Sequence, residues 1–181
     1  MATPQEAISQ SNIRWQVNVG PLVCIAGQPM IFVTIGTTDF DQLVQKMDSL
    51  APSLSEQVVL QIGKSSYAPR NCEYFRFAPT LEPYIARANL VVSQGGMAVT
   101  YEVLRQGKKL ISVENTTYAD GHQKEILEVL AEENYLVWCR NLDELPSLLE
   151  RAPKLELKPY TTPPCTIADE IRTYLSGLER K

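Results

Sequence analysis

The feature that most constrains the fold is a regular alternation of short apolar runs with amphipathic segments, which begins at Met30. The apolar runs have the length of buried strands, and the amphipathic segments carry apolar residues at helical spacing. This alternation is typical of a parallel sheet whose strands are joined by crossover helices. The sequence therefore predicts an α/β fold with strands at residues 31–35, 57–62, 73–77, 90–93, 109–113 and 135–138.

Helices are expected between these strands and after the last of them. Thr38 is expected to cap the first helix, which ends near Leu50, with Asp39 and Asp41 in its first turn. The apolar spacing and the glycine and proline positions place the later helices by the same argument. They are expected at residues 79–87, 97–105, 126–130, 142–149 and 167–178.

The composition indicates a globular protein and disfavours several functions. With 181 residues, of which 44% are hydrophobic and 21% charged, the chain is long enough for one domain with a real core. The net charge of -4 gives no electrostatic reason to bind nucleic acid. No apolar run approaches the roughly 20 residues of a membrane-spanning helix. Any membrane contact is therefore expected to be peripheral or through a partner.

The cysteines and the start of the chain indicate a cytoplasmic protein. The four cysteines form no CxxC pair and have no histidine nearby, so neither a zinc site nor a disulfide framework is suggested. They are interpreted as reduced thiols. Residues 1–12 are polar, and the apolar stretch 21–27 lacks a basic flank, so no secretory signal is expected.

The chain is expected to contain one folded domain with an extension at each end. Residues 1–29 are predicted to be an N-terminal extension, which is either one extra strand or a disordered appendage. Residues 30–151 are predicted to form the domain. Residues 152–181 are predicted to be a proline-rich linker and a C-terminal helix, which packs either on this domain or on a partner.

Three loops are expected at the carboxyl ends of the strands, where ligands bind in open parallel sheets. They are residues 36–38, 93–96 and 121–123. The pair Gly95 and Gly96 would let a diphosphate approach the backbone, because neither residue has a Cβ atom. A tight turn is the alternative interpretation of these glycines. The chain contains neither GxGxxG nor GxxxxGK[ST], so the families that carry those motifs have no support.

Two titratable residues are candidates for binding and catalysis. Glu102 lies six residues beyond Gly96, where its carboxylate could accept two hydrogen bonds from a ribose diol. His122 is the only histidine in the chain and is expected at the start of a helix, where it could donate to a phosphate oxygen or a sugar hydroxyl. A solvated glutamate and an incidental surface histidine are the alternatives.

Four motifs, when they are read together, resemble the glycosyltransferase family 28 C-terminal domain: VTIGTT (33–38), QIGKSSYAP (61–69), SQGGMAVTYEVLRQGK (93–108) and GHQKEI (121–126). The resemblance covers residues 30–181. More narrowly, the chain is similar to the small catalytic subunits of two-part UDP-sugar transferases, either of the dolichol pathway or of the PssE type in exopolysaccharide synthesis. The resemblance implies the Rossmann-like, donor-binding half of a GT-B glycosyltransferase.

The resemblance also implies roles for individual residues in binding a UDP-sugar. The turn formed by Gly36, Thr37 and Thr38 is expected to face the diphosphate or the sugar. Phe77 and Ala78 fall at the position where a backbone pair reads the uracil in a more distant relative.

The remaining candidates follow the fourth expected strand or begin the helix near residue 122. His122 is the expected catalytic residue, and both His122 and Gln123 are expected to contact the donor sugar or its phosphate. Four more residues complete the expected donor site. The glycine loop contains Gln94, Gly95 and Gly96, and Glu102 is expected to bind the ribose.

Several positions depart from the family pattern. Gln94 stands in place of a histidine, Ala98 in place of a glycine, and Val99 in place of a serine. Gln94 can still donate a hydrogen bond, but it cannot carry charge. Val99 removes one phosphate donor unless Thr100 takes over. We interpret these changes as adaptation to a different sugar, because the expected ribose ligand and the His-Gln pair remain.

The resemblance implies an inverting UDP-sugar glycosyltransferase subunit that transfers a hexose or an N-acetylhexosamine to a lipid-linked saccharide acceptor. No metal or other cofactor is expected. A membrane-anchored partner subunit is expected to recruit the chain to the cytosolic face of a membrane and to bind the acceptor. Two alternatives stay open. One is a non-catalytic UDP-sugar-binding or scaffolding subunit, and the other is an unrelated nucleotide-binding Rossmann domain.

Overall fold

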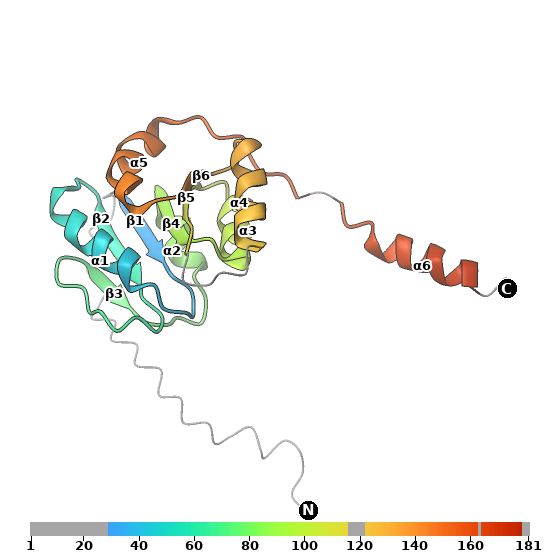
Figure 1. Ribbon diagram of the computed structural model, residues 1–181, viewed down its shortest axis with the longest axis horizontal. Coiled ribbons are helices and arrows are strands. Elements are labelled where there is room, and N and C mark those ends of the chain that lie inside the picture. Colours follow the sequence, from blue (N-terminus) through green and yellow to red (C-terminus); the bar gives the residue numbers. More distant parts are fainter. Residues whose placement is uncertain (1–28, 116–121, 163, 179–181) are drawn as a thin grey trace, which may run out of the picture.

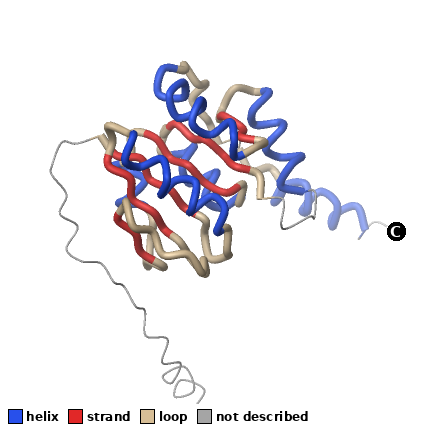
Figure 2. Tube along the Cα trace, turned by 60° about the vertical axis from the view of Figure 1, so that its left-hand side comes forward, coloured by secondary structure: helices blue, strands red, loops and turns tan. Residues whose placement is uncertain are grey.

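A computed structural model describes residues 29–115, 122–162 and 164–178 (Figure 1). The described chain forms a parallel sheet with helices on both faces, as Figure 2 shows. The predicted α/β architecture is therefore confirmed. The predicted N-terminal extension lies, apart from Pro29, outside the described residues, and so does Gly121.

The sheet has six strands in the order β3-β2-β1-β4-β5-β6, and all neighbouring strands are parallel. This is the order of doubly wound nucleotide-binding folds, in which the direction of winding reverses between β1 and β4. Each predicted strand is present, with ends shifted by a few residues at most. The strands are β1 Met30–Thr34, β2 Gln57–Gln61, β3 Glu73–Phe75, β4 Leu90–Gln94, β5 Lys109–Val113 and β6 Val137–Cys139.

Helices cover the two faces of the sheet unequally. α1 (Asp41–Leu50) and α5 (Leu145–Arg151) pack on one face. α2 (Glu82–Arg87), α3 (Met97–Arg105) and α4 (His122–Glu132) pack on the other. Three short 3₁₀ helices complete the domain: η2 Ala51–Ser53, η3 Leu142–Glu144 and η4 Ala152–Lys154.

β1 lies in the centre of the sheet and is buried along its whole length. Ile31 and Val33 point into the core under α1 and α5, whereas Phe32 points into the core under α2, α3 and α4. This alternation explains why the strand is a continuous apolar run, since a central strand of a doubly covered sheet has no face in water. Phe32 also stacks on Tyr84, with a ring centroid separation of 5.4 Å.

The predicted cap of α1 is wrong. α1 begins at Asp41, and the residue in the N-cap position is Phe40, which makes no side-chain cap. Phe40 is buried in the core under α1, so the helix can start only after this residue has turned inward. The Thr38 hydroxyl instead donates to the carbonyl oxygen of Ile35 at 3.1 Å and closes the turn after β1.

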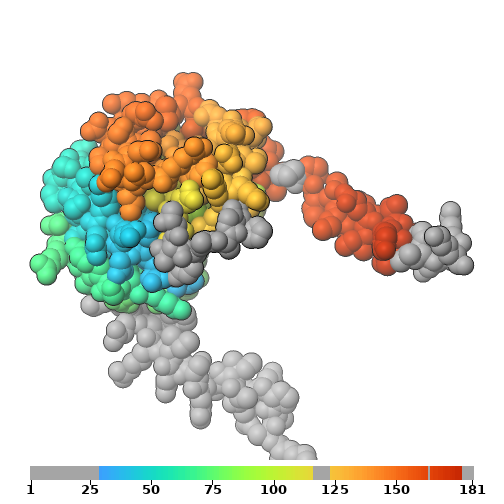
Figure 3. All heavy atoms as spheres, in the orientation of Figure 1, coloured from blue at the N-terminus to red at the C-terminus, as the bar shows by residue number. Residues whose placement is uncertain are grey.

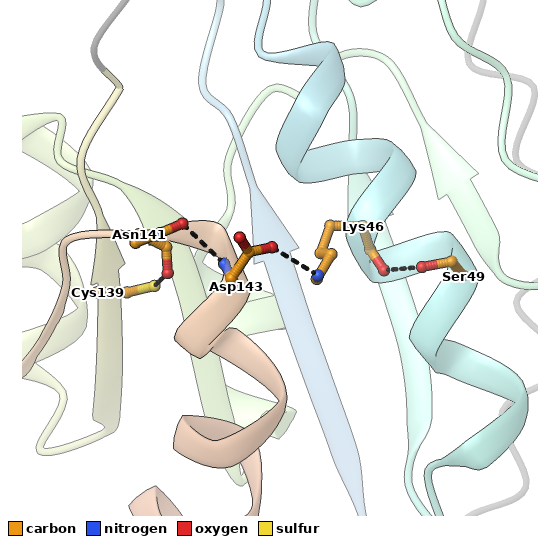
Figure 4. Close-up of polar contacts among 5 residues, drawn as sticks. All are labelled: Lys46, Ser49, Cys139, Asn141 and Asp143. Carbon is orange, nitrogen blue, oxygen red and sulfur yellow. Dashed lines mark hydrogen bonds and ion pairs between the residues drawn. The ribbon is translucent and has the colours of Figure 1, made fainter.

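Figure 4 shows how the end of β6 is joined to α1. The Asn141 side chain accepts a hydrogen bond from the Asp143 N–H and caps η3, and Asp143 pairs with Lys46 of α1 at 3.4 Å. The Cys139 thiol donates to the Asn141 carbonyl at 3.1 Å. Burial raises the pKa of this thiol to about 11, so it stays protonated and keeps its donor at neutral pH.

Two carboxylates of α1 hold the loop at residues 63–72. Asp41 accepts hydrogen bonds from the hydroxyls of Ser65 and Ser66 and from the Ser66 N–H. Asp48 is 1% exposed and accepts from the Tyr67 hydroxyl at 2.7 Å and from the Asn71 N–H at 2.7 Å. Because they lie seven residues apart, the two carboxylates share one face of the helix. They therefore fix the loop after β2 at both of its ends.

The C-terminal helix α6 (Ile167–Leu178) extends away from the domain (Figure 1). The chain is held to the domain up to Tyr160, whose ring contacts those of Tyr101 and Tyr135 at centroid separations of 5.6 and 5.3 Å. Beyond that point the apolar side chains of α6 are exposed by 52 to 69%, namely Ile167, Ile171, Tyr174 and Leu175. Of the two expectations for this helix, packing on its own domain does not occur.

Among residues 29–115, 122–162 and 164–178, no helix has both the length and the hydropathy needed to cross a membrane.

We predict that Asp48→Asn destabilises the fold and reduces its sensitivity to acid. Burial alone would raise the pKa of Asp48, but hydrogen bonds from Asn71, Tyr67 and Arg70 outweigh it, and the pKa lies below its usual 3.8. The carboxylate thus adds stability above about pH 4, which is lost as the pH falls through the lowered pKa. In urea unfolding at neutral pH, the variant should lose about 2–4 kcal/mol.

The matched control for this prediction is Asp143→Asn. The Asp143 side chain is 86% exposed, so its ion pair with Lys46 should contribute less than about 1 kcal/mol. If the two variants lose equal stability, or if Asp48→Asn unfolds as steeply as the wild type on acidification, Asp48 does not hold the loop.

Candidate functional site

The candidate site lies at the carboxyl ends of β1 and β4, where the winding of the sheet reverses. Thr34 and Ser93 are paired in the register of these strands, so the loops that follow them meet. Ligands of open α/β sheets bind at this place, because the neighbouring loops diverge to opposite faces and leave a crevice.

The Gln94 side chain joins the loops that follow three strands. Its Nε2 donates to the Thr38 hydroxyl at 2.6 Å, and its Oε1 accepts from Asn115 Nδ2 at 3.2 Å. Gln94 is 9% exposed. The amide group that replaces the family's histidine is thus engaged within the protein on both sides, and it fixes the loops after β1, β4 and β5 to one another.

The Gln61 side chain performs a similar role on the other side of β1. Its Nε2 donates to the carbonyl oxygens of Gly36 at 2.6 Å and Arg76 at 2.8 Å. Its Oε1 accepts from the Thr34 hydroxyl at 2.5 Å and from the Gly36 N–H at 3.1 Å. Both polar backbone groups of Gly36 therefore bind Gln61, which is 3% exposed. Thr37 is the exposed residue of the predicted turn.

Gly63 brings the loop after β2 into close contact with the turn after β1. A Cβ atom at Gly63 would lie 2.5 Å from the Gly36 carbonyl oxygen and 2.6 Å from that of Thr38. Gly63 also has a φ of +46°, a region that side chains disfavour. The sequence motif contains this glycine, and the structure shows why no larger residue fits there.

The glycine pair leads into the N-terminus of α3. The Gly95 N–H donates to the Val113 carbonyl at 3.0 Å, and Gly96 is the N-cap of the helix. Within the part of the chain that the structure describes, no side chain caps α3, and the first N–H groups of the helix have no intrahelical acceptor. Uncapped N–H groups and the helix dipole together favour an anion at this end. The arrangement supports the interpretation of a phosphate site.

Two residues of α3 bear on that site. Glu102 is half-buried, and no hydrogen bond or ion pair with another described residue occupies its carboxylate. Thr100 is fully buried and its hydroxyl donates to the Gly96 carbonyl at 3.0 Å. Thr100 therefore does not replace the phosphate donor that Val99 removes, because its only hydroxyl hydrogen points into the helix.

The first two turns of α4 lie against Gly95. A Cβ atom at Gly95 would lie 2.7 Å from Leu127 Cδ1 and 3.6 Å from Gln123 Oε1. The helix starts at His122, whose side chain lies outside the described residues. The structure thus places Gln123 beside Gly95, and the catalytic role of His122 stays a prediction.

The predicted uracil contacts lie elsewhere on the same edge. Phe77 and Ala78 follow β3, the strand at the far end of the sheet, and both are half-buried. β3 is separated from β4 by β2 and β1, which corresponds to about 14 Å at the usual strand spacing. A ligand that contacts both Phe77 and the α3 N-terminus must therefore span the crevice.

The segment after β1 contains a DxD sequence, a spacing found in metal sites. Asp39, Phe40 and Asp41 have the spacing of a DxD sequence, but the Asp41 carboxylate binds Ser65 and Ser66. These hydrogen bonds, chiefly that from Ser65, lower the pKa of Asp41. Within the described part of the chain, no three His, Cys, Asp or Glu side chains are grouped in a way that could hold a metal ion.

Sequence reasoning missed Gln61 and Asn115. Each is a polar residue at or just after the end of a mainly apolar strand, and this position is the only sign of a role in the sequence. The sign is weak because a polar residue at the end of a strand is usually solvated. Only the tertiary structure shows that Gln61 binds the turn after β1 and that Asn115 binds Gln94 at the end of β4.

The fold defines the class of protein. The domain has the Rossmann-like fold of one half of a GT-B glycosyltransferase, and solved structures agree with this fold. The kitacinnamycin glycosyltransferase matches with a TM-score of 0.58 at 18% identity, covering 71% of this chain and 35% of that one. MurG of Acinetobacter baumannii matches with a TM-score of 0.55 at 18% identity, covering 69% and 41%.

The chain belongs to the glycosyltransferase family 28 C-terminal domain family, whose sequence profile matches residues 30–174. The human protein named UDP-N-acetylglucosamine transferase subunit ALG13 is 32% identical over 125 residues, which is 60% of this chain and 11% of that protein. The protein of the same name from Kluyveromyces lactis is 38% identical over 86 residues, or 46% of this chain and 43% of that one.

A solved structure carries the same name. The NMR solution structure of ALG13 matches with a TM-score of 0.53 at 18% identity and covers 75% of this chain and 90% of that chain. Among the relatives found by sequence, this chain spans about a tenth of the human protein and less than half of the Kluyveromyces lactis protein.

We predict that Gly63→Ala destabilises the candidate site more than Gly107→Ala does. Both glycines have positive φ values, +46° and +66°, so each substitution should cost about 1 kcal/mol in backbone strain. A Cβ at Gly107 meets nothing within 4 Å, whereas one at Gly63 meets two carbonyl oxygens. Thermal unfolding should show an additional loss of about 2 kcal/mol or more for Gly63→Ala. Equal losses would show that the loops after β1 and β2 are not tightly packed.

Proposed function

We propose that this chain is the donor-binding, catalytic subunit of a UDP-sugar glycosyltransferase. In this proposal it transfers a hexose or an N-acetylhexosamine to a lipid-linked saccharide acceptor, together with a membrane-anchored partner subunit at the cytosolic face of a membrane. The names of the ALG13 relatives favour N-acetylglucosamine as the sugar.

One observation carries the proposal. The N-terminus of α3 begins at Gly96, directly after the reversal point of the sheet, and no described side chain caps it. Glu102 lies on the same helix, and its carboxylate has no hydrogen bond or ion pair with another described residue. The helix end suits a diphosphate, and a carboxylate less than two turns further on suits the ribose hydroxyls of the same nucleotide. A nucleoside diphosphate joins these two features in one ligand.

The chemistry that this site can support is stabilisation of a leaving diphosphate. As the acceptor hydroxyl attacks the anomeric carbon, negative charge develops on the phosphate oxygens of UDP. N–H groups fixed at the start of α3 are already oriented toward that charge, so no reorganisation is needed during the reaction. We propose that this arrangement, with His122 at the start of α4, allows transfer without a bound metal.

The coverage of the matching structures supports the proposal of a partner. This chain covers 35 to 41% of the matching glycosyltransferase structures, so more than half of each has no counterpart in it. We propose that the acceptor is bound by a partner that supplies this half and that α6 docks on it. The apolar residues 167, 171, 174 and 175 of α6 form one exposed stripe, which suits burial against another protein.

The second candidate function is a UDP-sugar-binding subunit without catalytic activity. The observation that favours it is the engagement of Gln94, whose amide binds Thr38 and Asn115 and leaves no charge or transferable proton at that position. The two candidates differ in turnover and agree in nucleotide binding, so one assay can separate them.

We predict that Glu102→Ala and His122→Ala abolish most sugar transfer. The substrate is a UDP-sugar with a lipid-linked acceptor, and the assay uses the chain co-expressed with its membrane-anchored partner. Loss of two hydrogen bonds to a carboxylate should lower kcat/KM about 100-fold for Glu102→Ala. The control is Glu132→Ala at the opposite end of α4, which should leave transfer unchanged. Unchanged turnover in the first two variants would reject the catalytic proposal.

Calorimetry distinguishes the other outcomes. The proposal requires UDP to bind more tightly than NAD or ATP, and it requires transfer to persist in the presence of EDTA. UDP binding without turnover would favour the non-catalytic subunit. Preferential binding of NAD or ATP would reject a glycosyltransferase function altogether, and EDTA inhibition would reject the metal-free mechanism.

We predict that Ile171→Asp prevents docking of the partner without destabilising the domain. The Ile171 side chain is 52% exposed in the isolated chain, so the substitution removes no core packing. Co-purification with the membrane-anchored partner should fall at least tenfold, because burial of an unpaired carboxylate is unfavourable. The control, Ser176→Asp, changes the opposite face of α6. Retained co-purification of Ile171→Asp would show that α6 is not the docking element.

A further inference from the structure

Two buried serines and a half-buried tryptophan lie side by side near the carboxyl ends of β4, β5 and β6. The register pairs Ser93 with Ser112, and Ser112 with Trp138. Ser93 and Ser112 are both fully buried. Within the described residues, neither hydroxyl has a hydrogen-bond partner, and the same holds for the buried Trp138 Nε1.

These side chains share the face of the sheet that α3 and α4 cover. Val91 and Leu110, two residues before Ser93 and Ser112, lie in the core cluster that contains Leu127 of α4. Side chains two residues apart on a strand point to the same side, and the Trp138 ring packs against the same cluster. The row therefore lies between the sheet and α4, below the glycine pair.

A fourth buried polar atom approaches from α4. Gln123 Oε1 is buried and has no partner among the described residues. It lies 3.6 Å from the point where a Cβ atom would be if Gly95 had a side chain. Gly95 comes two residues after Ser93, so this point and the Ser93 side chain are on the same side of the strand. Gln123 Oε1 therefore lies on the face of the sheet that carries the row, beside the continuation of β4.

The four atoms are chemically complementary. Gln123 Oε1 only accepts hydrogen bonds, Trp138 Nε1 only donates, and the two serine hydroxyls can do both. Each of them costs about 1–3 kcal/mol if it stays unpaired in the interior. Buried water typically makes about three hydrogen bonds to such groups, and it can accept from an indole while donating to a carbonyl.

We propose that Ser93, Ser112 and Trp138 form a buried water site that holds the Gln123 amide at the start of α4. The bound water accepts from Trp138 Nε1 and exchanges hydrogen bonds with the serines, and the network donates to Gln123 Oε1. With its oxygen held inward, the amide keeps its Nε2 on the outer side of the helix start. Ser112 is then a positioning residue for Gln123.

This orientation has a consequence for the donor site, and that consequence rests on the proposed function. An outward Nε2 next to the α3 N-terminus offers two N–H donors to a phosphate or sugar oxygen. Without the water network, the amide could rotate and present its oxygen to the diphosphate, which would repel it. The network therefore favours an anionic ligand at the glycine pair.

The test is NMR spectroscopy of the full chain labelled with ¹⁵N. The indole N–H of Trp138, assigned by comparison with Trp138→Phe, should show a cross-relaxation signal to a long-lived bound water. Ser112→Ala should remove that signal and shift the side-chain NH₂ resonances of Gln123. The matched control is Ser176→Ala on the exposed face of α6, which should change neither.

Calorimetry with UDP adds the functional measurement. Ser112→Ala should weaken UDP binding roughly fivefold, the effect of about one lost hydrogen bond. A missing water signal in the wild type, or a crystal structure in which Ser93 and Ser112 bond directly to each other with no water, would overturn the proposal. Wild-type protein that shows the water but does not bind UDP would leave the water site standing and reject the proposed function instead.

Discussion

The pairing of β1 with β4 is the interaction on which the rest of the structure depends. Thr34 and Ser93 lie side by side because these two strands are parallel neighbours, although they are far apart in the chain. Their pairing reverses the direction of winding and brings the turn after β1 next to the glycine pair. The α3 N-terminus is thereby directed into the crevice in which α/β folds bind ligands.

Neutral amide side chains, rather than ion pairs, hold the loops of this crevice. Gln61 joins the turn after β1 to the end of β3, and Gln94 joins that turn to Asn115 after β5. An amide donates and accepts at once, so it can satisfy two loops without placing a charge near a bound diphosphate. The carboxylates of Asp41 and Asp48 hold the loop after β2 instead. The hydrogen bonds that join the loops after β1, β4 and β5 through Gln94 therefore involve no charged side chain.

The described chain consists of a compact domain and one helix that lies away from it. Figure 3 shows the compact body formed by the sheet and its helices, with α6 outside it. The family match ends at residue 174, so it includes most of α6. The exposed apolar side chains of α6 follow a segment that Tyr160 holds to the domain through its contacts with Tyr101 and Tyr135. The described part of the chain holds no competing apolar surface of comparable length on the domain itself.

The sequence by itself determined the α/β class, the six strands, the α3 helix and the family, because periodicity and motif spacing are local properties of the chain. It misplaced the start of α1, since the burial of Phe40 depends on the opposing sheet. Only the tertiary structure decided that Gln94 binds inward to Thr38 and Asn115, and that Gly63 lies against the Gly36 carbonyl. Those contacts join residues from separate strands, and sequence spacing contains no information about which strands become neighbours.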